Sequence, residues 1–144
     1  MHLTQQTNYA LRILMYLAAT KKPAKIGDIA ERHAISRNHL VKIVHRLGFE
    51  GYVSTKQGRH GGIELAMPPA NISVGEIVRL TEDHMFLVQC FGAQDTSCKL
   101  KPICRLRKTF FRALDAFMRE LDSVSIADIA GNSTQIRNAL GIEK

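Results

Sequence analysis

The sequence predicts a mainly α-helical fold, a winged helix-turn-helix with a small β-hairpin wing and a long C-terminal helix. Two short stretches of apolar residues at helical spacing, joined by a tight turn, predict the helix-turn-helix. A glycine-rich hairpin that follows them predicts the wing. An uninterrupted apolar stripe after the last cysteine predicts the long helix. We expect residues 1–82 to form the winged unit and residues 83–144 to form a cysteine-containing loop and the long helix.

The first helix is expected over residues 9–19, where apolar residues are interrupted only by Arg12. Thr4 or Thr7 is expected to cap its start, because a threonine hydroxyl accepts a hydrogen bond from the free amides of the first turn. Lys21, Lys22 and Pro23 end it.

The helix-turn-helix follows directly, and Ser36 is the expected cap of its second helix. Gly48 and Gly51 are expected to stop that helix. Residues 52–57 and 63–67 then have strand-like character and flank the segment GRHGG, whose glycines permit a tight hairpin. The apolar positions of the two helices are Ile26, Ile29 and Ala30, then Leu40, Ile43, Val44 and Leu47.

Three helical segments are expected after the wing. Ser73 and Glu76 form a capping-box pattern before the first of them. The second spans Cys104 to Leu121, and the third, SIADIA, begins at Ser125, with a mobile tail behind it. The apolar stripe of the long helix contains Leu106, Phe110, Ala113, Leu114, Phe117 and Leu121.

The net charge favours a polyanionic partner. Lys and Arg number 20 against 13 Asp and Glu, which gives a formal charge of +7, and nucleic acid is the first such partner to consider. The N-terminal segment lacks the pattern of a signal peptide, and no apolar run is long enough to span a membrane. We therefore expect a cytoplasmic protein with no membrane partner.

Polar and basic side chains gather where a winged helix-turn-helix meets DNA. The first turn of the second helix faces base edges in the major groove, and the wing reaches the backbone or the minor groove. A solvated basic loop and an ordinary polar helix face are the alternative for each element alone, but charge and spacing together predict binding to double-stranded DNA. The candidate contacts are Ser36, Arg37, Asn38, His39 and Lys42 on the helix, and Lys56, Gln57, Arg59 and His60 on the wing.

No enzymatic site emerges from the sequence. It contains no evident pairing of a nucleophile with a base, and GRHGG lies in a hairpin rather than at the start of a helix, which is the wrong context for binding a nucleotide.

All three cysteines, Cys90, Cys98 and Cys104, fall within one short segment. Their spacing matches neither a zinc ribbon nor a ferredoxin, so spacing alone leaves three alternatives. The thiols hold an iron–sulfur cluster, they bind zinc with His84 as the fourth ligand, or they are small apolar residues of the core. Three thiolates around iron would leave one coordination position open to nitric oxide or oxygen.

The chain resembles the iron–sulfur winged-helix regulators of the NsrR, RirA and IscR family. The resemblance rests on TNYALRILMYLA near the start, ISRNHLVKIVHRLGFEGYV, GRHGGIEL in the wing, ISVGEIVRLTED, the three cysteines and SIADIA. It implies a homodimeric repressor that binds a palindromic operator. In it Cys90, Cys98 and Cys104 ligate a cluster, 4Fe–4S in preference to 2Fe–2S. Leu106, Phe110, Leu114, Phe117 and Leu121 meet their symmetry mates in the dimer.

The sequence is closest to the NsrR and RirA branches and departs from the family pattern at three positions. Asn8 stands where NsrR-type proteins can supply an aspartate as fourth ligand, so water, a small thiol or Asn8 of the partner subunit takes that place. Arg107 replaces the histidine of IscR-type proteins, which argues against that branch. Gln57 replaces the usual arginine before the first wing glycine, and Lys56 or Arg59 would take over its contact.

Nitric oxide is the favoured signal, with iron or oxygen status as the other candidates. A regulator of a different class remains open, namely a winged-helix protein without a cofactor that is controlled by thiol oxidation or a small ligand.

Overall fold

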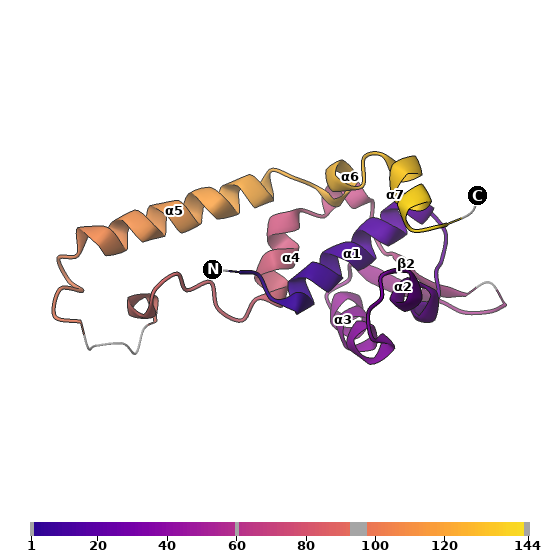
Figure 1. The fold of residues 1–144 in the computed structure, drawn as a ribbon, viewed down its shortest axis with the longest axis horizontal. Coiled ribbons are helices and arrows are strands. Elements are labelled where there is room, and N and C mark those ends of the chain that lie inside the picture. The colour runs from indigo at the N-terminus through magenta and orange to yellow at the C-terminus, as the bar shows by residue number, and fades with distance from the viewer. Residues whose placement is uncertain (1, 60, 93–97, 143–144) are drawn as a thin grey trace.

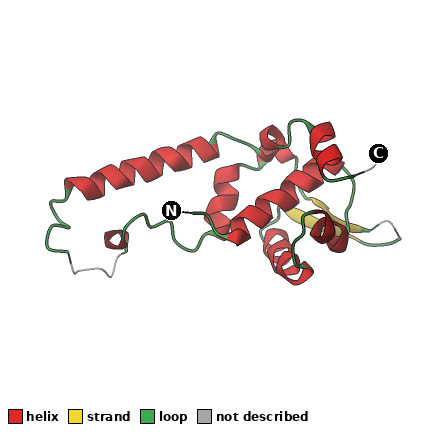
Figure 2. Cartoon of the chain, viewed as in Figure 1, coloured by secondary structure: helices red, strands yellow, loops and turns green. Residues whose placement is uncertain are grey.

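The computed structural model describes residues 2–59, 61–92 and 98–142, and it confirms a mainly helical winged fold. Figure 1 shows that the chain runs outward from the body after α4 and returns along α5, so this part forms an extended arm. Figure 2 separates the helices from the single hairpin. The elements are α1 (Gln5–Thr20), α2 (Ile26–Arg32), α3 (Arg37–Phe49), β1 (Val53–Lys56), β2 (Gly62–Leu65), α4 (Val74–Thr81), α5 (Arg105–Asp122), α6 (Ile126–Ile129) and α7 (Ser133–Ala139), with single turns η1 (Pro69–Asn71) and η2 (Gln89–Phe91).

Helix α1 is the centre of the body. Thr4 caps it, because the Thr4 hydroxyl accepts a hydrogen bond from the backbone N–H of Thr7 at 3.4 Å. Thr7 itself is buried and shares a hydrogen bond of 2.7 Å with the hydroxyl of Thr81 in α4. Elements α3, α4, α6, α7 and β2 all contact α1. Its fully buried apolar side chains are Ala10, Ile13, Leu14 and Ala19.

Helices α2 and α3 form the predicted helix-turn-helix, with two local differences from expectation. Ser36 occupies the N-cap position of α3, but its side chain makes no capping hydrogen bond. Gly48 lies inside α3, which ends one residue later, and Gly51 adopts a φ of 80° in the turn that follows. The predicted apolar residues of α3 are all buried, namely Leu40, Ile43, Val44 and Leu47.

The wing is attached to the helix-turn-helix by backbone pairing. Strands β1 and β2 are antiparallel, with Val53 opposite Leu65 and Lys56 opposite Gly62. Ala24, just before α2, pairs with Ile63 through two hydrogen bonds of 2.9 and 2.8 Å. This close pairing requires glycine at position 62, because a Cβ there would lie 2.5 Å from the carbonyl oxygen of Ala24.

The predicted capping box at α4 is confirmed. The Ser73 hydroxyl accepts from the N–H of Glu76, and the Glu76 carboxylate accepts from the N–H of Ser73, both at 3.0 Å. Arg79 in α4 then donates two hydrogen bonds of 2.6 Å to the carboxylate of Asp122, the last residue of α5. Hydrogen bonding and the charge of Arg79 hold the pKa of Asp122 below its ordinary value.

The segment after α6 is helical, whereas we expected a mobile tail. Helix α7 begins at a side-chain cap, since Asn132 accepts from the N–H of Gln135 at 3.1 Å. Arg137 donates to the carbonyl of Ala19 in α1 at 3.1 Å. Arg32 of α2 donates to the carbonyls of Leu140 and Gly141 at 2.6 Å. The tail is therefore fixed to the body by tertiary contacts.

No helix in the described ranges is both long enough and apolar enough to cross a bilayer.

Gly62→Ala should destabilise the protein, because the added methyl group must displace the backbone of Ala24. We expect a loss of about 1–3 kcal/mol in the free energy of unfolding, measured by thermal unfolding at fixed protein concentration. Gly27→Ala is the matched control, since nothing lies within 4 Å of its new Cβ, and it should leave stability unchanged or raise it. Equal effects of the two substitutions would contradict the close approach at Gly62.

Candidate functional site

The first turn of α3 presents the predicted DNA-contacting side chains to solvent. Helix α3 buries one face against the body, so its opposite face is free to enter a groove. The exposed residues of that face include all the predicted ones on this helix, which are Ser36, Arg37, Asn38, His39 and Lys42.

Sequence reasoning missed three residues on the same outer face. Val41, His45 and Phe49 are exposed, and their spacing of four residues places them in line along the helix. The exposed fractions are 44% for Val41 and 84% for Phe49, which is high for apolar side chains. The residue pattern around α3 could have revealed them, because the buried residues Leu40, Ile43, Val44 and Leu47 fix which face is outward.

The predicted wing residues Lys56, Gln57 and Arg59 are also exposed, and His60 lies outside the described residues. Lys56 forms an ion pair of 3.3 Å with Glu64 across the hairpin. Arg59 forms no ion pair with any described residue. A surface pair like that of Lys56 is weak, so its cation remains available to a phosphate.

A hollow of about 470 Å³ lies between the wing and α3, the reading helix that is expected to enter the DNA groove. Arg37 of α3, Lys25 and Asp28 at α2, and Thr55 of β1 line it. Arg37 therefore lines one hollow together with residues of α2 and of the hairpin. A phosphate backbone that crosses this hollow would meet cations from two elements at once.

The three cysteines lie along the arm. Cys90 is half-buried in η2, Cys98 is exposed, and Cys104 is half-buried at the N-cap of α5. All three are free thiols, and the Cys104 sulfur accepts a hydrogen bond from the N–H of Arg107 at 3.3 Å. The exposed or half-buried positions differ from those of small core residues.

The thiols suit an iron–sulfur cluster by their chemistry, because three free cysteines of one loop supply the ligand type that such clusters use. Among the described residues, however, no three side chains of His, Cys, Asp or Glu are placed to hold one metal ion. This result concerns a single ion, whereas each iron of a 4Fe–4S cluster takes only one thiolate. The thiols and His84 therefore form no zinc site among the described residues, and the His84 ring stacks on Phe86 at 5.1 Å.

Arg107 and Phe111 connect the Cys90 segment to α5. The Arg107 Nε donates to the carbonyl oxygen of Cys90 at 3.2 Å, and its guanidinium lies 4.7 Å from the centre of the Phe111 ring. Phe111 stacks in parallel on Phe91, with 4.0 Å between ring centres. Lys101 donates to the carbonyl oxygen of Gly92 at 3.1 Å. These contacts fold η2 back onto the first turns of α5.

Asn8 is exposed on α1, and among the described residues it forms no hydrogen bond with the cysteine loop of its own chain. The start of α1 is instead fixed by Glu82, which accepts hydrogen bonds from the N–H of Thr4 at 2.7 Å and from the hydroxyls of Thr4 and Thr7. Burial raises the pKa of Glu82, but the hydrogen bonds from Thr7 and Thr4 outweigh it, and the pKa lies below its ordinary value.

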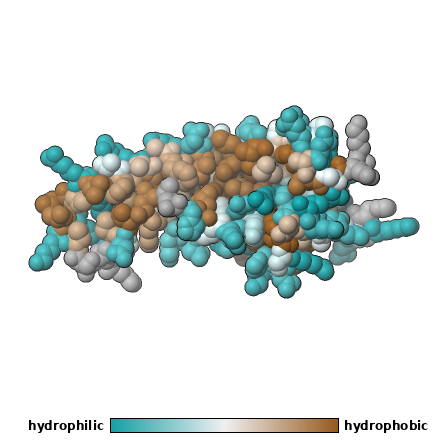
Figure 3. All heavy atoms as spheres, in the orientation of Figure 1, coloured by the Kyte–Doolittle hydropathy of each residue, from teal (hydrophilic) through white to brown (hydrophobic). Residues whose placement is uncertain are grey.

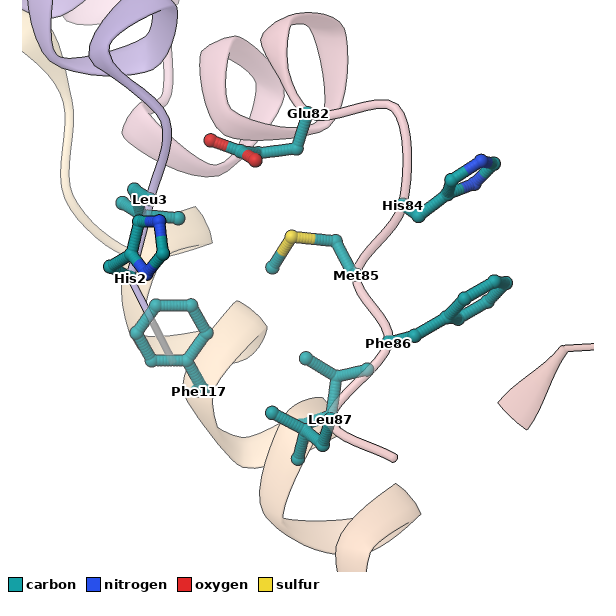
Figure 4. A pocket seen from close by; sticks show the side chains of 9 residues that line it. His2, Leu3, Glu82, His84, Met85, Phe86, Leu87 and Phe117 are labelled. Atoms are coloured by element: carbon teal, nitrogen blue, oxygen red, sulfur yellow. The ribbon is translucent and has the colours of Figure 1, made fainter. Parts of the chain in front are cut away.

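A second hollow, of about 540 Å³, lies beside Glu82 between the N-terminal residues, residues 82–87 and α5. Figure 4 shows Met85, Leu87 and Phe117 turned toward Leu3, whereas His84 and Phe86 point away from this group. The hollow is thus mainly apolar, with the Glu82 carboxylate at one end.

The apolar stripe of α5 is divided between two environments. Leu114, Phe117 and Leu121 are partly buried against the core of their own chain. Leu106 at the other end of the helix is 61% exposed, and Leu100 and Ile103 just before it are also exposed. Figure 3 shows hydrophobic atoms along the arm that continue over the upper part of the body, whereas hydrophilic atoms dominate the lower part of the body.

This fold, with a polar and basic reading helix beside a wing, defines a winged-helix transcription regulator that binds DNA rather than an enzyme. The family model of the Rrf2 proteins, described as iron-dependent transcriptional regulators, matches residues 3–132. The chain therefore belongs to the Rrf2 family.

Relatives support the same assignment over the whole length. The chain is 46% identical over 142 residues to the HTH-type transcriptional regulator NsrR of Geobacillus kaustophilus, with 97% of each protein covered. It is 42% identical over 146 residues to NsrR of Bacillus subtilis, with 100% of each covered. Protein aau3 of Rhizobium meliloti is 39% identical over 145 residues, with 100% of this chain and 94% of that protein covered.

Solved structures share the architecture. CymR, the global cysteine regulator of B. subtilis, matches with a TM-score of 0.75 at 26% identity, and covers 91% of this chain and 97% of that one. IscR of T. potens matches with a TM-score of 0.72 at 22% identity over 95% of this chain and 91% of that one, a likeness of fold alone.

Glu82→Gln should lower the free energy of unfolding near neutral pH, because folding lowers the pKa of Glu82 and thus stabilises its ionised form. This contribution is present above the unfolded-state pKa and is lost as the pH falls through the folded-state pKa. The difference between wild type and variant should therefore shrink between about pH 7 and about pH 3 in urea unfolding experiments. Glu31→Gln, at an exposed position, is the control. A difference that stays constant with pH would contradict this role of the carboxylate.

Proposed function

We propose that this protein is a homodimeric repressor whose cysteine loop holds an iron–sulfur cluster and whose DNA binding responds to nitric oxide. The observation that carries the proposal is the set of three free thiols on one loop of a chain that is 46% identical to a regulator named NsrR. A cytoplasmic location follows from a DNA target. Iron or oxygen status is the other candidate signal.

Cys90, Cys98 and Cys104 are the proposed ligands. Such a cluster, 4Fe–4S in preference to 2Fe–2S, supplies iron that reacts with nitric oxide when one coordination position lacks a cysteine. Asn8 is exposed, and its amide oxygen would be a weak fourth ligand for the cluster of a second subunit. Water or a small thiol would serve the same position.

The exposed end of the α5 stripe supports the dimer. Leu100, Ile103 and Leu106 are each more than half exposed, and contiguous apolar surface of this kind marks an interaction site. In a two-fold dimer the α5 helices would pair through this end, with Phe110 beside it, while Leu114, Phe117 and Leu121 keep their own core contacts. Two copies of α3 would then face a palindromic operator.

The proposed units are residues 1–82 for DNA binding and residues 83–144 for sensing and dimerisation. The second unit is in contact with the first, because α6 and α7 pack on α1 and Asp122 pairs with Arg79. Coordination of a cluster by the thiols would fix residues 83–104 against α5. This would set the spacing of the two α3 helices in the dimer. Loss of the cluster would free this loop. The dimer would then no longer favour the conformation in which both copies of α3 fit the operator.

On DNA, we assign base contacts to the first turn of α3 and phosphate or minor-groove contacts to the wing. The base-reading set is Ser36, Arg37, Asn38, His39 and Lys42, and the wing set is Lys56, Gln57, Arg59 and His60.

A second candidate is a regulator without a cofactor that is controlled by thiol oxidation or a small ligand. The exposed thiol of Cys98 and the likeness to CymR, the global cysteine regulator of B. subtilis, favour it.

Protein purified without oxygen should contain iron, absorb visible light and bind a DNA site selected from a random duplex library. Nitric oxide should weaken that binding, as measured by anaerobic titration. Cys98→Ser should reduce the iron content and the response, whereas Ser97→Ala beside it is the control for a change in the same loop. Iron-free, colourless protein with unchanged operator binding would reject the cluster and leave the second candidate.

Val41→Ala should weaken binding to the selected site by roughly fourfold, because Val41 is an exposed apolar residue on the base-facing side of α3 and can contact a thymine methyl group. Replacing each thymine in turn with deoxyuridine removes one methyl group. One position per half-site should lower the affinity of wild type but not that of Val41→Ala. Parallel losses in both proteins at every position would show that Val41 reads no methyl group.

A further inference from the structure

Arg107 contacts both half-buried cysteine segments. Its side-chain Nε donates to the carbonyl oxygen of Cys90 at 3.2 Å, and its backbone N–H donates to the sulfur of Cys104 at 3.3 Å. The bond to Cys104 is made by the backbone at position 107, whereas the bond to Cys90 depends on the arginine side chain, which holds the backbone of Cys90 beside the first turn of α5.

The aromatic pair beside Arg107 strengthens this connection. Phe91 follows Cys90 and is 8% exposed, and its ring stacks on Phe111 at 4.0 Å with an interplanar angle of 2°. Phe111 lies four residues after Arg107, one helical turn on, and the guanidinium lies over the Phe111 ring, 4.7 Å from its centre. The backbone of η2 is thereby held on the same face of α5 that begins at Cys104.

Cys98 differs from the other two cysteines. Its side chain is exposed. Its backbone carbonyl accepts a hydrogen bond from the N–H of Lys101 at 3.1 Å, which closes a local turn. No described contact joins its thiol to α5.

We propose that Arg107 is a positioning residue whose side chain holds the Cys90 segment against the first turn of α5, beside Cys104, before any cluster is present. This inference rests on the proposed function for its purpose, because preorganised ligands need less ordering when they bind. Arg107 acts through these contacts and not as a ligand, because guanidinium groups are always protonated and only donate hydrogen bonds.

The test uses the full-length, reduced, metal-free protein under anaerobic conditions. Each thiol is alkylated with a limiting amount of iodoacetamide, and its rate is read separately by peptide mass mapping. Arg107→Ala should raise the rate at Cys90 several-fold, while Cys104, whose sulfur still accepts from the backbone N–H at position 107, and Cys98 keep their rates. Arg112→Ala, at an exposed position of the same helix, is the matched control and should change none of the three.

Two further variants separate geometry from charge and from folding. Arg107→Lys keeps the positive charge but lacks the planar Nε donor, so we expect it to behave like Arg107→Ala; full restoration of the wild-type rates would overturn the proposed geometry. Phe111→Leu keeps Arg107 and removes the stacked ring, and it too should expose Cys90. If Arg107→Ala lowers the helix content measured by circular dichroism, the alkylation rates of Phe111→Leu are used to test the proposal in its place.

Cluster assembly gives a second readout. With ferrous iron and sulfide, the visible absorption of Arg107→Ala should develop more slowly than that of wild type and of Arg112→Ala. Unchanged alkylation rates in both Arg107→Ala and Phe111→Leu would overturn the proposal. Wild-type protein that takes up no iron would instead refute the proposed function, and the alkylation rates would still decide whether Arg107 positions the thiols.

Discussion

The burial of α1 is the constraint on which the rest of the structure depends. Its side chains Ile13 and Leu14 have no exposed surface, and each such burial contributes about 1.5–3 kcal/mol. Ala10 and Ala19 are also fully buried, and their small size lets neighbouring elements approach closely. Because α3, α4, α6, α7 and β2 all rest on this one helix, the reading helix, the wing and the base of the arm share a single support.

The arm is built differently from the body. Met118 is the one buried residue of α5, and the outer part of the arm is held by hydrogen bonds, stacked rings and a guanidinium. The arm joins the body at its inner end, where Leu114, Phe117 and Leu121 pack against the core and Arg79 pairs with Asp122. There the N–H of Val74 also donates to the carbonyl of Val124 at 2.8 Å. A segment with few buried apolar side chains opens at a lower free-energy cost than one with a large core, so the outer arm is expected to be less stable locally than the body.

Glycines and strand-like residues predicted the hairpin, and the capping-box pattern of Ser73 and Glu76 predicted α4. Apolar periodicity predicted α1, α2, α3 and α5, although the one buried residue of α5, Met118, lay outside the predicted stripe. It failed at α7, where Ile136 and Leu140 provide too little pattern and the helix depends on Arg137 and Arg32 from distant contacts. The cysteine ligands were chosen from residue type, and the sequence held no sign that Arg107 would reach Cys90. Side-chain contacts over such distances arise only once the chain is folded.

The bond network of Arg32 has a practical consequence. One guanidinium nitrogen holds the carbonyls of Leu140 and Gly141, so the final turn of the chain is clasped to the same short helix that leads into the DNA-reading turn. Affinity labels or fluorescent fusions joined immediately behind Ile142 would strain this clasp. A flexible spacer between the chain and the fused group would leave these hydrogen bonds to α2 undisturbed.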